Sequence, residues 1–193
     1  MLLGVRAALA CLGVALAAGA VAGCGNEPSK PPTVTAPKEA FGWVDQPLPT
    51  QGVTFQRPSA WRWTPGNPPL LGTVSSGLVT ISVWRYPRDE PLPETLEELT
   101  VATEALVAAA QARDPTFKVI KAKGTRAAHR PAVVIIGDET VAGEPRRVRS
   151  THIYTDESEF VIDAFAPADQ YAQVEESIIV EMVRTFRFEP ATK

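Results

Sequence analysis

Cysteine and histidine are scarce in this chain of 193 residues, which contains two of each. The cysteines are Cys11 and Cys24, and the histidines are His129 and His152. A structural zinc site needs about four cysteine or histidine ligands at short spacing, which this sequence does not provide. We therefore predict no metal site and no cofactor, and a serine hydrolase would have to use one of the two histidines as its base.

Long hydrophobic runs are also few. One uncharged apolar run, from Ala7 to Gly23, follows a single positive charge at Arg6. The run is rich in alanine and glycine, is shorter than the about 20 strongly apolar residues that span a bilayer, and has no basic stop-transfer cluster behind it. These features are typical of a secretory signal peptide and do not fit a transmembrane helix.

Small residues precede a cysteine where this run ends, in Val21-Ala22-Gly23-Cys24. The motif resembles the bacterial lipobox, in which the cysteine is diacylglycerylated on sulfur and becomes the mature N-terminus. Val21, Ala22 and Gly23 match the small-residue triplet, and Cys24 matches the lipid acceptor. The resemblance implies a protein anchored to the cell membrane through diacylglyceryl-Cys24, with its domain on the extracytoplasmic side, because two or three acyl chains hold a protein stably on a bilayer.

Removal of the signal peptide fixes the thiol content and the charge of the mature chain. Cys11 is lost with the signal peptide and Cys24 carries lipid, so we expect no disulfide. Only Arg6 is charged in residues 1–23, which leaves 18 basic and 22 acidic residues in the mature protein. The negative charge and the compartment both argue against a nucleic-acid partner.

Composition divides the chain into three parts. We predict a lipoprotein signal peptide at 1–23, a lipidated N-terminus with a proline-rich tether at 24–50, and a single globular domain at 51–193. Phe41 and Trp43 interrupt the tether, and they either cover part of the domain or face a partner. The domain is large enough to be stable through its core alone.

Hydrophobic periodicity within the domain predicts both strands and helices. The segment 78–86 is apolar on both faces, which favours a sheet covered on each side. Short turns between consecutive strands predict antiparallel neighbours. The predicted strands are 53–58, 61–63, 70–74, 78–86, 117–123, 132–138, 147–154, 160–166 and 186–188, and the predicted helices are 94–112 and 167–182.

The order of these elements resembles the PsbP-like fold, and in particular its bacterial lipoprotein members, which include the LpqN-type lipoproteins. The resemblance rests on Gly52 to Trp61, where an opening strand runs into a Pro-x-x-Trp turn, on the strands 131–136 and 147–154, and on the closing Thr185 to Phe188. It implies an α+β fold with an antiparallel β-sheet flanked by helices, an α/β/α sandwich. It also implies an assembly factor, accessory subunit or binding module, since the family lacks a common active site.

Segments that superficially suggest catalytic or ligand-binding chemistry do not match the corresponding motifs. The serines of 72–77 lack the flanking glycines of a nucleophile elbow, so we predict a hairpin turn there. The acidic turn 156–159 lacks the alternating ligands of a calcium loop, and no glycine-rich phosphate loop follows a strand. We predict no catalytic residue, although a structure that buried His129 or His152 beside Asp163 or a serine would favour an enzyme.

Basic residues are concentrated in 118–149, which contains eight of them against three acids, whereas 156–181 contains eight acids and no base. If 118–123 and 146–149 meet at one end of the sheet, they form a basic patch that could face anionic headgroups or acidic envelope polymers. The alternative is pairing with the acidic helix faces through weak surface ion pairs. The candidate patch residues are Lys121, Lys123, Arg147 and Arg149.

Aromatic residues are concentrated in the first half of the domain. Tryptophan offers a large contact area and a hydrogen-bond donor, which suits binding surfaces, but it is also an ordinary core residue. A groove that held a lipid or glycolipid would be lined by Trp61, Trp63, Trp84 and Tyr86.

Two functions from different classes follow. The first is a membrane-anchored envelope lipoprotein that acts as a non-enzymatic binding or accessory module for a protein partner or an amphiphilic ligand. The alternative is an envelope hydrolase with a site that the sequence does not reveal.

Overall fold

A computed structural model describes residues 36–141 and 143–190. The predicted signal peptide and the lipid acceptor Cys24 lie outside the described residues, so lipidation stays a prediction. Within the described ranges, no helix is both long and apolar enough to cross a bilayer.

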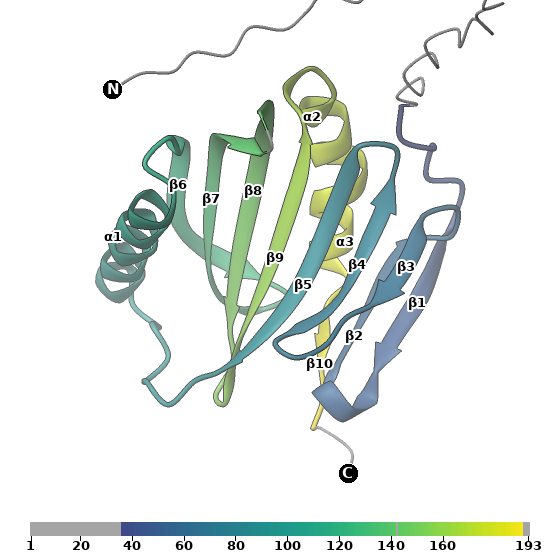
Figure 1. The fold of residues 1–193 in the computed structure, drawn as a ribbon. Coiled ribbons are helices and arrows are strands. Elements are labelled where there is room, and N and C mark those ends of the chain that lie inside the picture. Colours follow the sequence, from purple (N-terminus) through teal and green to yellow (C-terminus); the bar gives the residue numbers. More distant parts are fainter. Residues whose placement is uncertain (1–35, 142, 191–193) are drawn as a thin grey trace, which may run out of the picture. The chain divides into compact units, whose positions relative to one another are not determined.

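Two antiparallel sheets and two helical segments make up the fold (Figure 1). The larger sheet has the order β3-β4-β5-β9-β8-β7-β6, and the smaller sheet has the order β1-β2-β10. The larger sheet consists of β3 (Arg62–Pro65), β4 (Leu70–Ser76), β5 (Val79–Pro87), β9 (Ser158–Pro167), β8 (Glu144–Tyr154), β7 (Arg130–Val141) and β6 (Lys118–Ala127). The smaller sheet consists of β1 (Trp43–Leu48), β2 (Val53–Pro58) and β10 (Arg187–Phe188).

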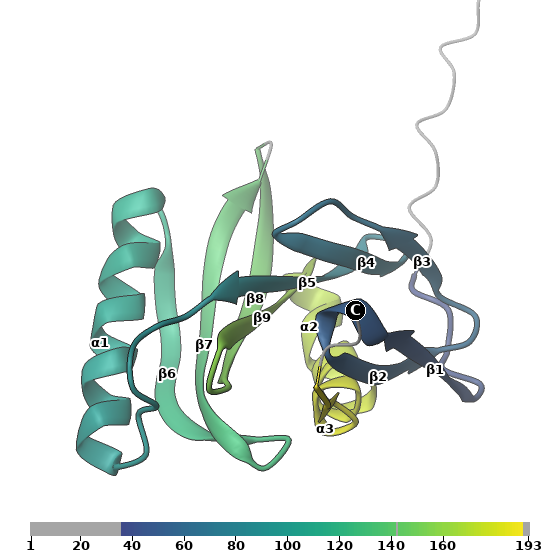
Figure 2. The same cartoon turned by 90° about the horizontal axis from the view of Figure 1, so that it is seen from below.

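Helices cover both faces of the larger sheet (Figure 2). The first is α1 (Leu96–Arg113), which packs on β6 and β7. The second, near the C-terminus, is continuous and consists of α2 (Ala168–Val174), a π-helical segment (Glu175–Ile179) and α3 (Val180–Arg184). A short 3-10 turn (Pro49–Gln51) joins β1 to β2.

Alternating residues of β7 separate the core into two clusters. Val133 and Ile135 belong to the cluster beneath α1, whereas Val134 and Ile136 belong to the larger cluster that includes α2 and α3. Successive side chains of a strand point to opposite faces, so α1 and the C-terminal helix lie on opposite faces of the same sheet. We refer to these as the α1 face and the α2 face.

The smaller sheet closes the α2 side of the core. Phe55 of β2 is fully buried and stacks on Phe186, with ring centroids 4.8 Å apart. Trp61 is also buried, and its Nε1 donates to the carbonyl oxygen of Lys38 at 2.8 Å.

The predicted fold class is confirmed, since the structure is an α+β fold of antiparallel strands with helices on both faces. The predicted helix 94–112 begins at Leu96, because Thr95 caps it: its hydroxyl accepts from the Glu98 backbone N–H at 3.2 Å, and the Glu98 carboxylate accepts from the Thr95 backbone N–H at 2.9 Å. The predicted helix 167–182 contains a π-helical turn that periodicity did not indicate.

Two features differ from the sequence prediction. The strands form two sheets, because β2 pairs with β1 and β10 and does not join the larger sheet. In addition, β1 lies inside the range 24–50 predicted as a tether, so the folded part begins before residue 51. This edge strand has no fully buried residue and contains Pro47, which an edge strand tolerates, so it lacks the apolar alternation that identifies a buried strand.

Candidate functional site

The four basic residues singled out in the sequence line one pocket on the α2 face. Lys121 and Lys123 project from β6, and Arg147 and Arg149 project from β8, on the other side of β7. Residues directly opposite in an antiparallel pair share a face, and the register pairs Lys121 with Ile136 and Ile136 with Arg149. We call this pocket, of about 350 Å³, the basic pocket; the residues lining it are Ile120, Lys121, Lys123, Val134, Ile136, Arg147, Arg149, Tyr171, Ala172 and Glu175.

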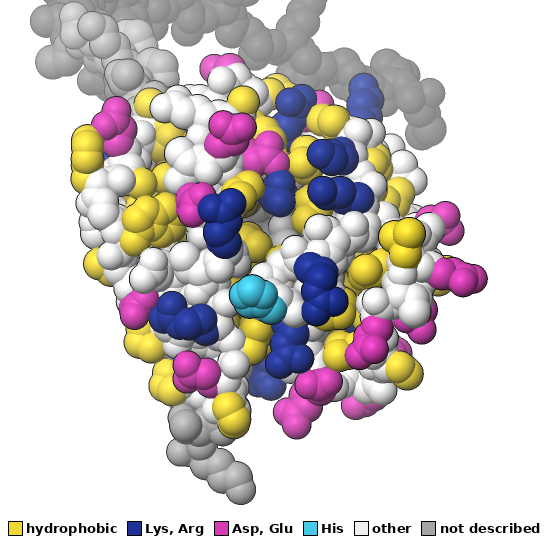
Figure 3. Space-filling view, turned by 180° about the vertical axis from the view of Figure 1, so that it is seen from behind, with side chains coloured by type: hydrophobic (Ala, Val, Ile, Leu, Met, Phe, Trp, Pro, Cys, Tyr) yellow, Lys and Arg dark blue, Asp and Glu magenta, His cyan; other side chains and the backbone are white. Residues whose placement is uncertain are grey.

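Only part of the positive charge in the basic pocket is neutralised. Arg147 donates two hydrogen bonds to Asp138, at 2.8 and 3.1 Å, and these bonds raise the pKa of Arg147. Arg149 pairs with Glu175 at 2.5 Å. Lys121 and Lys123 form no ion pair within the described part of the chain. The space-filling view from behind shows lysine and arginine side chains gathered on this side of the molecule (Figure 3).

Two buried donors in the basic pocket are unused. The Tyr171 hydroxyl and the Arg149 Nε form no hydrogen bond of good geometry among the described residues, and Tyr171 is only 4% exposed, but the hydroxyl lies beside the Glu175–Arg149 ion pair, and both of these side chains affect its pKa. Burial raises the pKa of Tyr171, so its phenol stays neutral and can donate a hydrogen bond. Buried polar groups in folded proteins are nearly always paired, so these two donors are available to an acceptor that enters the pocket.

The π-helical segment begins at this pocket. Its first residue, Glu175, holds Arg149, and Tyr171 lies one turn earlier in α2. Single π-helical turns are rare and occur frequently at functional sites. Sequence reasoning did not identify Tyr171 or Glu175 as site residues, because neither stands out from an ordinary helix pattern.

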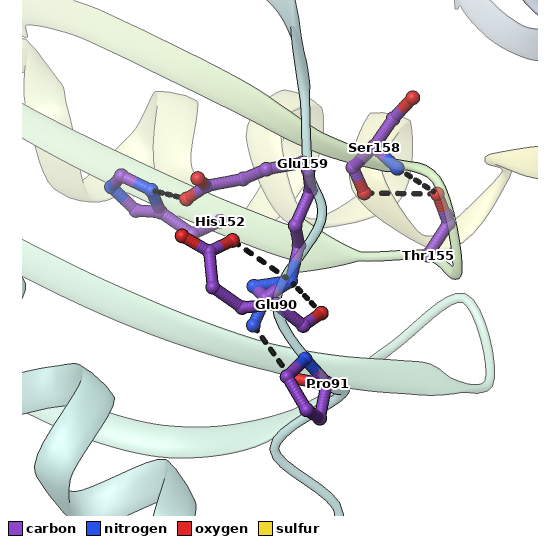
Figure 4. A network of polar contacts seen from close by, with 7 residues as sticks. Glu90, Pro91, His152, Thr155, Ser158 and Glu159 are labelled. Atoms are coloured by element: carbon purple, nitrogen blue, oxygen red, sulfur yellow. Dashed lines mark hydrogen bonds and ion pairs between the residues drawn. The ribbon is translucent and has the colours of Figure 1, made fainter.

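A second polar cluster lies on the α1 face. Ser150 and His152 project from β8, and Glu159 and Asp163 project from β9. The Ser150 Oγ lies 3.0 Å from His152 Nε2 and 2.6 Å from an oxygen of Asp163. On the other side of the imidazole ring, His152 Nδ1 lies 2.6 Å from Glu159, a contact that Figure 4 shows. We call these four residues the serine–histidine cluster; together with residues of α1 and Tyr86 they line a pocket of about 240 Å³.

Desolvation by burial raises the pKa of Asp163 above its ordinary value. While Asp163 keeps its proton it can donate to Ser150, which leaves the Ser150 hydroxyl free to donate to His152 Nε2. When Asp163 ionises, the Ser150 hydroxyl donates to Asp163 instead. The hydrogen-bond direction in the cluster therefore depends on the proton of Asp163.

The serine–histidine cluster has the atom order of a catalytic triad but not its surroundings. The histidine nitrogens face serine and carboxylate as in serine hydrolases. Ser150, however, lies inside a strand that is paired on both sides, so the backbone N–H groups around it belong to the sheet. Acyl transfer needs donors aimed at the developing oxyanion, which backbone N–H groups usually supply. The other histidine, His129, lies in the turn between β6 and β7 with a φ of 64°.

The four aromatic residues do not line one groove, and of the two possibilities that the sequence left open, a groove or the core, Trp61 takes the second. Trp61 is a core residue, and Trp63 packs edge-on against Phe55 and fills the space above Gly72, where a Cβ would lie 2.3 Å from its ring. Trp84 and Tyr86 stack on each other on the α1 face. The separation arises because Trp61 and Trp63 pack into the core shared by the two sheets, whereas β5 directs its even-numbered residues to the opposite face.

Comparison with solved structures identifies proteins of similar fold. Neither a protein-family model nor a curated protein sequence matches this chain. Among solved structures, cyanobacterial PsbP (CyanoP) from Synechocystis sp. PCC 6803 is similar, with a TM-score of 0.57 over 79% of this chain and 98% of CyanoP, at 12% identity. The fold is PsbP-like. LpqN, involved in cell envelope biogenesis of Mycobacterium tuberculosis, is similar over 80% of this chain and 90% of LpqN, with a TM-score of 0.54 and 12% identity.

Replacing Asp163 with Asn tests whether the carboxyl of Asp163 keeps its proton to a higher pH than an ordinary aspartate does. The buried carboxyl has a raised pKa in the folded state, so in wild type it contributes stability at low pH that is lost as pH rises through that pKa. The Asn variant lacks this titration. We therefore expect the stability of the variant relative to wild type to rise with pH above about 4. Between the ordinary pKa of aspartate in the unfolded chain and the raised pKa in the fold, the slope should approach about 1.4 kcal/mol per pH unit.

Urea denaturation from pH 4 to 8 measures this difference. Asp89→Asn, at an exposed position, is the control and should show no such slope. A difference between Asp163→Asn and wild type that stays constant over this range would mean that Asp163 is ionised throughout.

Proposed function

We propose that this protein is a lipid-anchored envelope module that binds an anionic ligand through the basic pocket and does not catalyse a reaction. The observation that carries the proposal is the convergence of four cationic side chains from β6 and β8 on one pocket, with Lys121 and Lys123 left without an ion pair among the described residues. The PsbP-like fold supports it, because one similar structure, LpqN, is a protein of cell envelope biogenesis.

Edge protection is the competing explanation for the lysines. Strand β6 lies at the edge of the larger sheet, and lysines on an edge discourage pairing with other chains. That explanation does not account for Arg147 and Arg149, which lie on β8 in the interior of the sheet. We therefore favour a binding site over edge protection.

The anchor would keep the pocket close to the membrane. From Cys24 to Lys38, which is hydrogen-bonded to Trp61 and Ser76 of the domain, an extended proline-rich segment would reach at most about 43 Å at ~3.1 Å per residue. Anionic headgroups and membrane-associated envelope molecules lie within this distance, whereas the bilayer would separate an extracytoplasmic domain from nucleic acid.

Replacing Cys24 with Ala tests the anchor. The variant loses the sulfur that carries the diacylglyceryl group, so we expect it to move from the membrane fraction to the soluble fraction after cell lysis. Cys11→Ala, within the predicted signal peptide, is the matched control and should remain in the membrane fraction. A Cys24→Ala protein that stays with the membranes would contradict lipidation at this residue.

Charge reversal at the basic pocket tests the binding site. In the Cys24→Ala background, Lys121→Glu combined with Lys123→Glu should weaken binding to vesicles containing phosphatidylglycerol by about tenfold or more, since each lysine near an anionic surface contributes about 1 kcal/mol. Co-sedimentation measures the binding, and vesicles of neutral phosphatidylcholine give the background that does not depend on anionic lipid.

The control carries the same charge change elsewhere. Lys38→Glu combined with Arg62→Glu reverses two exposed cations outside the pocket, and Arg62 lies on β3, at the opposite edge of the larger sheet from β6. Equal losses in the two double variants would indicate that net charge, and not the pocket, governs binding.

An envelope hydrolase is the second candidate, because Ser150, His152 and Glu159 are connected in the order of nucleophile, base and orienting carboxylate. Since the site lacks free backbone donors, we expect a fluorophosphonate probe to leave Ser150 unlabelled, as judged by mass spectrometry against a Ser150→Ala control. Labelling that depends on both Ser150 and His152 would make the hydrolase the better description.

A further inference from the structure

The basic pocket favours one chemical class of anion over the others. Resting on the function proposed above, we infer that the pocket binds the dianionic phosphate of a phosphate monoester, with Tyr171 and Arg149 as donors and Lys121 and Lys123 as counter-charges. Three features of the pocket support this assignment: its net charge, its buried donors and its apolar rim.

Charge complementarity favours a dianion. Lys121, Lys123, Arg147 and Arg149 supply four positive charges, and Asp138 and Glu175 neutralise two of them. The pocket therefore keeps a net charge of +2. A phosphate monoester carries about −1.5 to −2 at neutral pH, whereas a phosphodiester or a carboxylate carries −1.

The donors also match a phosphate group. Arg149 Nε and the Tyr171 hydroxyl are buried and form no hydrogen bond of good geometry among the described residues, while the Lys121 and Lys123 ammonium groups form no ion pair there. A monoester presents three non-bridging oxygens, each able to accept more than one hydrogen bond. A carboxylate presents two oxygens, and a diester leaves only two non-bridging oxygens. The monoester thus offers one more acceptor oxygen to the four donors than a carboxylate or a diester does.

The pocket has room for more than the phosphate. Its volume of about 350 Å³ is roughly ten times the share of one water molecule in the liquid. Val134, Ile136 and Ala172 add apolar lining, and Ile120, at the irregular pairing of β6 with β7, is an exposed apolar residue at the pocket. The ester-linked part of the ligand therefore has an apolar component adjacent to the phosphate, as in a lipid or a small organic phosphate.

Vesicles of matched surface charge test the monoester directly. Full-length Cys24→Ala protein is titrated with phosphatidylcholine vesicles that contain phosphatidic acid, a monoester, or phosphatidylglycerol, a diester, at mole fractions that give equal surface charge. We expect binding to phosphatidic acid to be about fivefold or more tighter at pH 7.5. The preference should shrink toward pH 5, because the second pKa of a monoester is about 6.

Tyr171→Phe separates recognition from general electrostatics. The change removes one hydroxyl and no charge, and since Glu175 and Arg149 beside that hydroxyl stay paired with each other, the fold should keep its stability. We expect the variant to lose most of the preference for phosphatidic acid while its binding to phosphatidylglycerol is unchanged. Tyr86→Phe on the α1 face is the matched control, and Lys121→Gln is a second pocket variant that should also reduce the preference.

Each outcome decides between defined alternatives. Equal binding to the two lipids overturns the monoester inference and leaves the proposed function standing, whereas no binding to either lipid overturns both. A preference that survives in Tyr171→Phe and Lys121→Gln also overturns the inference, because it would arise outside the pocket. Where the preference is pocket-dependent, competition by soluble glycerol phosphate identifies a soluble monoester as the ligand, and its failure to compete identifies a membrane lipid.

Discussion

Alternation along the central strands is the constraint on which the rest of the structure depends. Strand β8 is paired on both sides, so each of its residues must face either α1 or the C-terminal helix. Arg147 and Arg149 face one way, and Ser150 and His152 face the other. A shift of one residue in register would exchange these sets and bury two arginines beneath α1. The register of β8 therefore fixes both polar sites at once.

The C-terminal helix completes only one of these sites. Its buried residues Val174, Ile178 and Met182 belong to the core cluster of the α2 face, and this packing fixes the position of the helix over β8 and β9. The π-helical turn adds one residue to the helical turn, which brings Glu175 to Arg149 while the apolar residues after it still reach the core. The π-helical turn thus allows the helix to pack on the core and Glu175 to reach Arg149 at the same time.

The parts of the fold that the sequence predicts are those governed by local periodicity. The alternation in 78–86 and 147–154 identified strands with two distinct faces, and the spacing in 118–123 and 146–149 placed four cations on the two strands that flank β7. Features that depend on distant segments were missed. The Tyr171 side chain reaches the basic pocket only because α2 crosses β8, and Glu159 and Asp163 meet His152 and Ser150 only because β9 pairs with β8. Polar residues at alternate positions of otherwise apolar strands were the available signal for that second cluster.

The architecture also limits what kind of chemistry each site can perform. In the interior of an antiparallel sheet the backbone N–H groups are hydrogen-bonded to neighbouring strands, so a site built there has only side chains to offer a ligand. Side chains such as those of Lys121, Lys123 and Arg149 are well suited to recognising fixed charge. Stabilising an oxyanion at Ser150 would need free backbone donors or substitutes for them, and the paired strand does not supply these. The same sheet therefore favours the binding role proposed for the basic pocket over acyl transfer at Ser150.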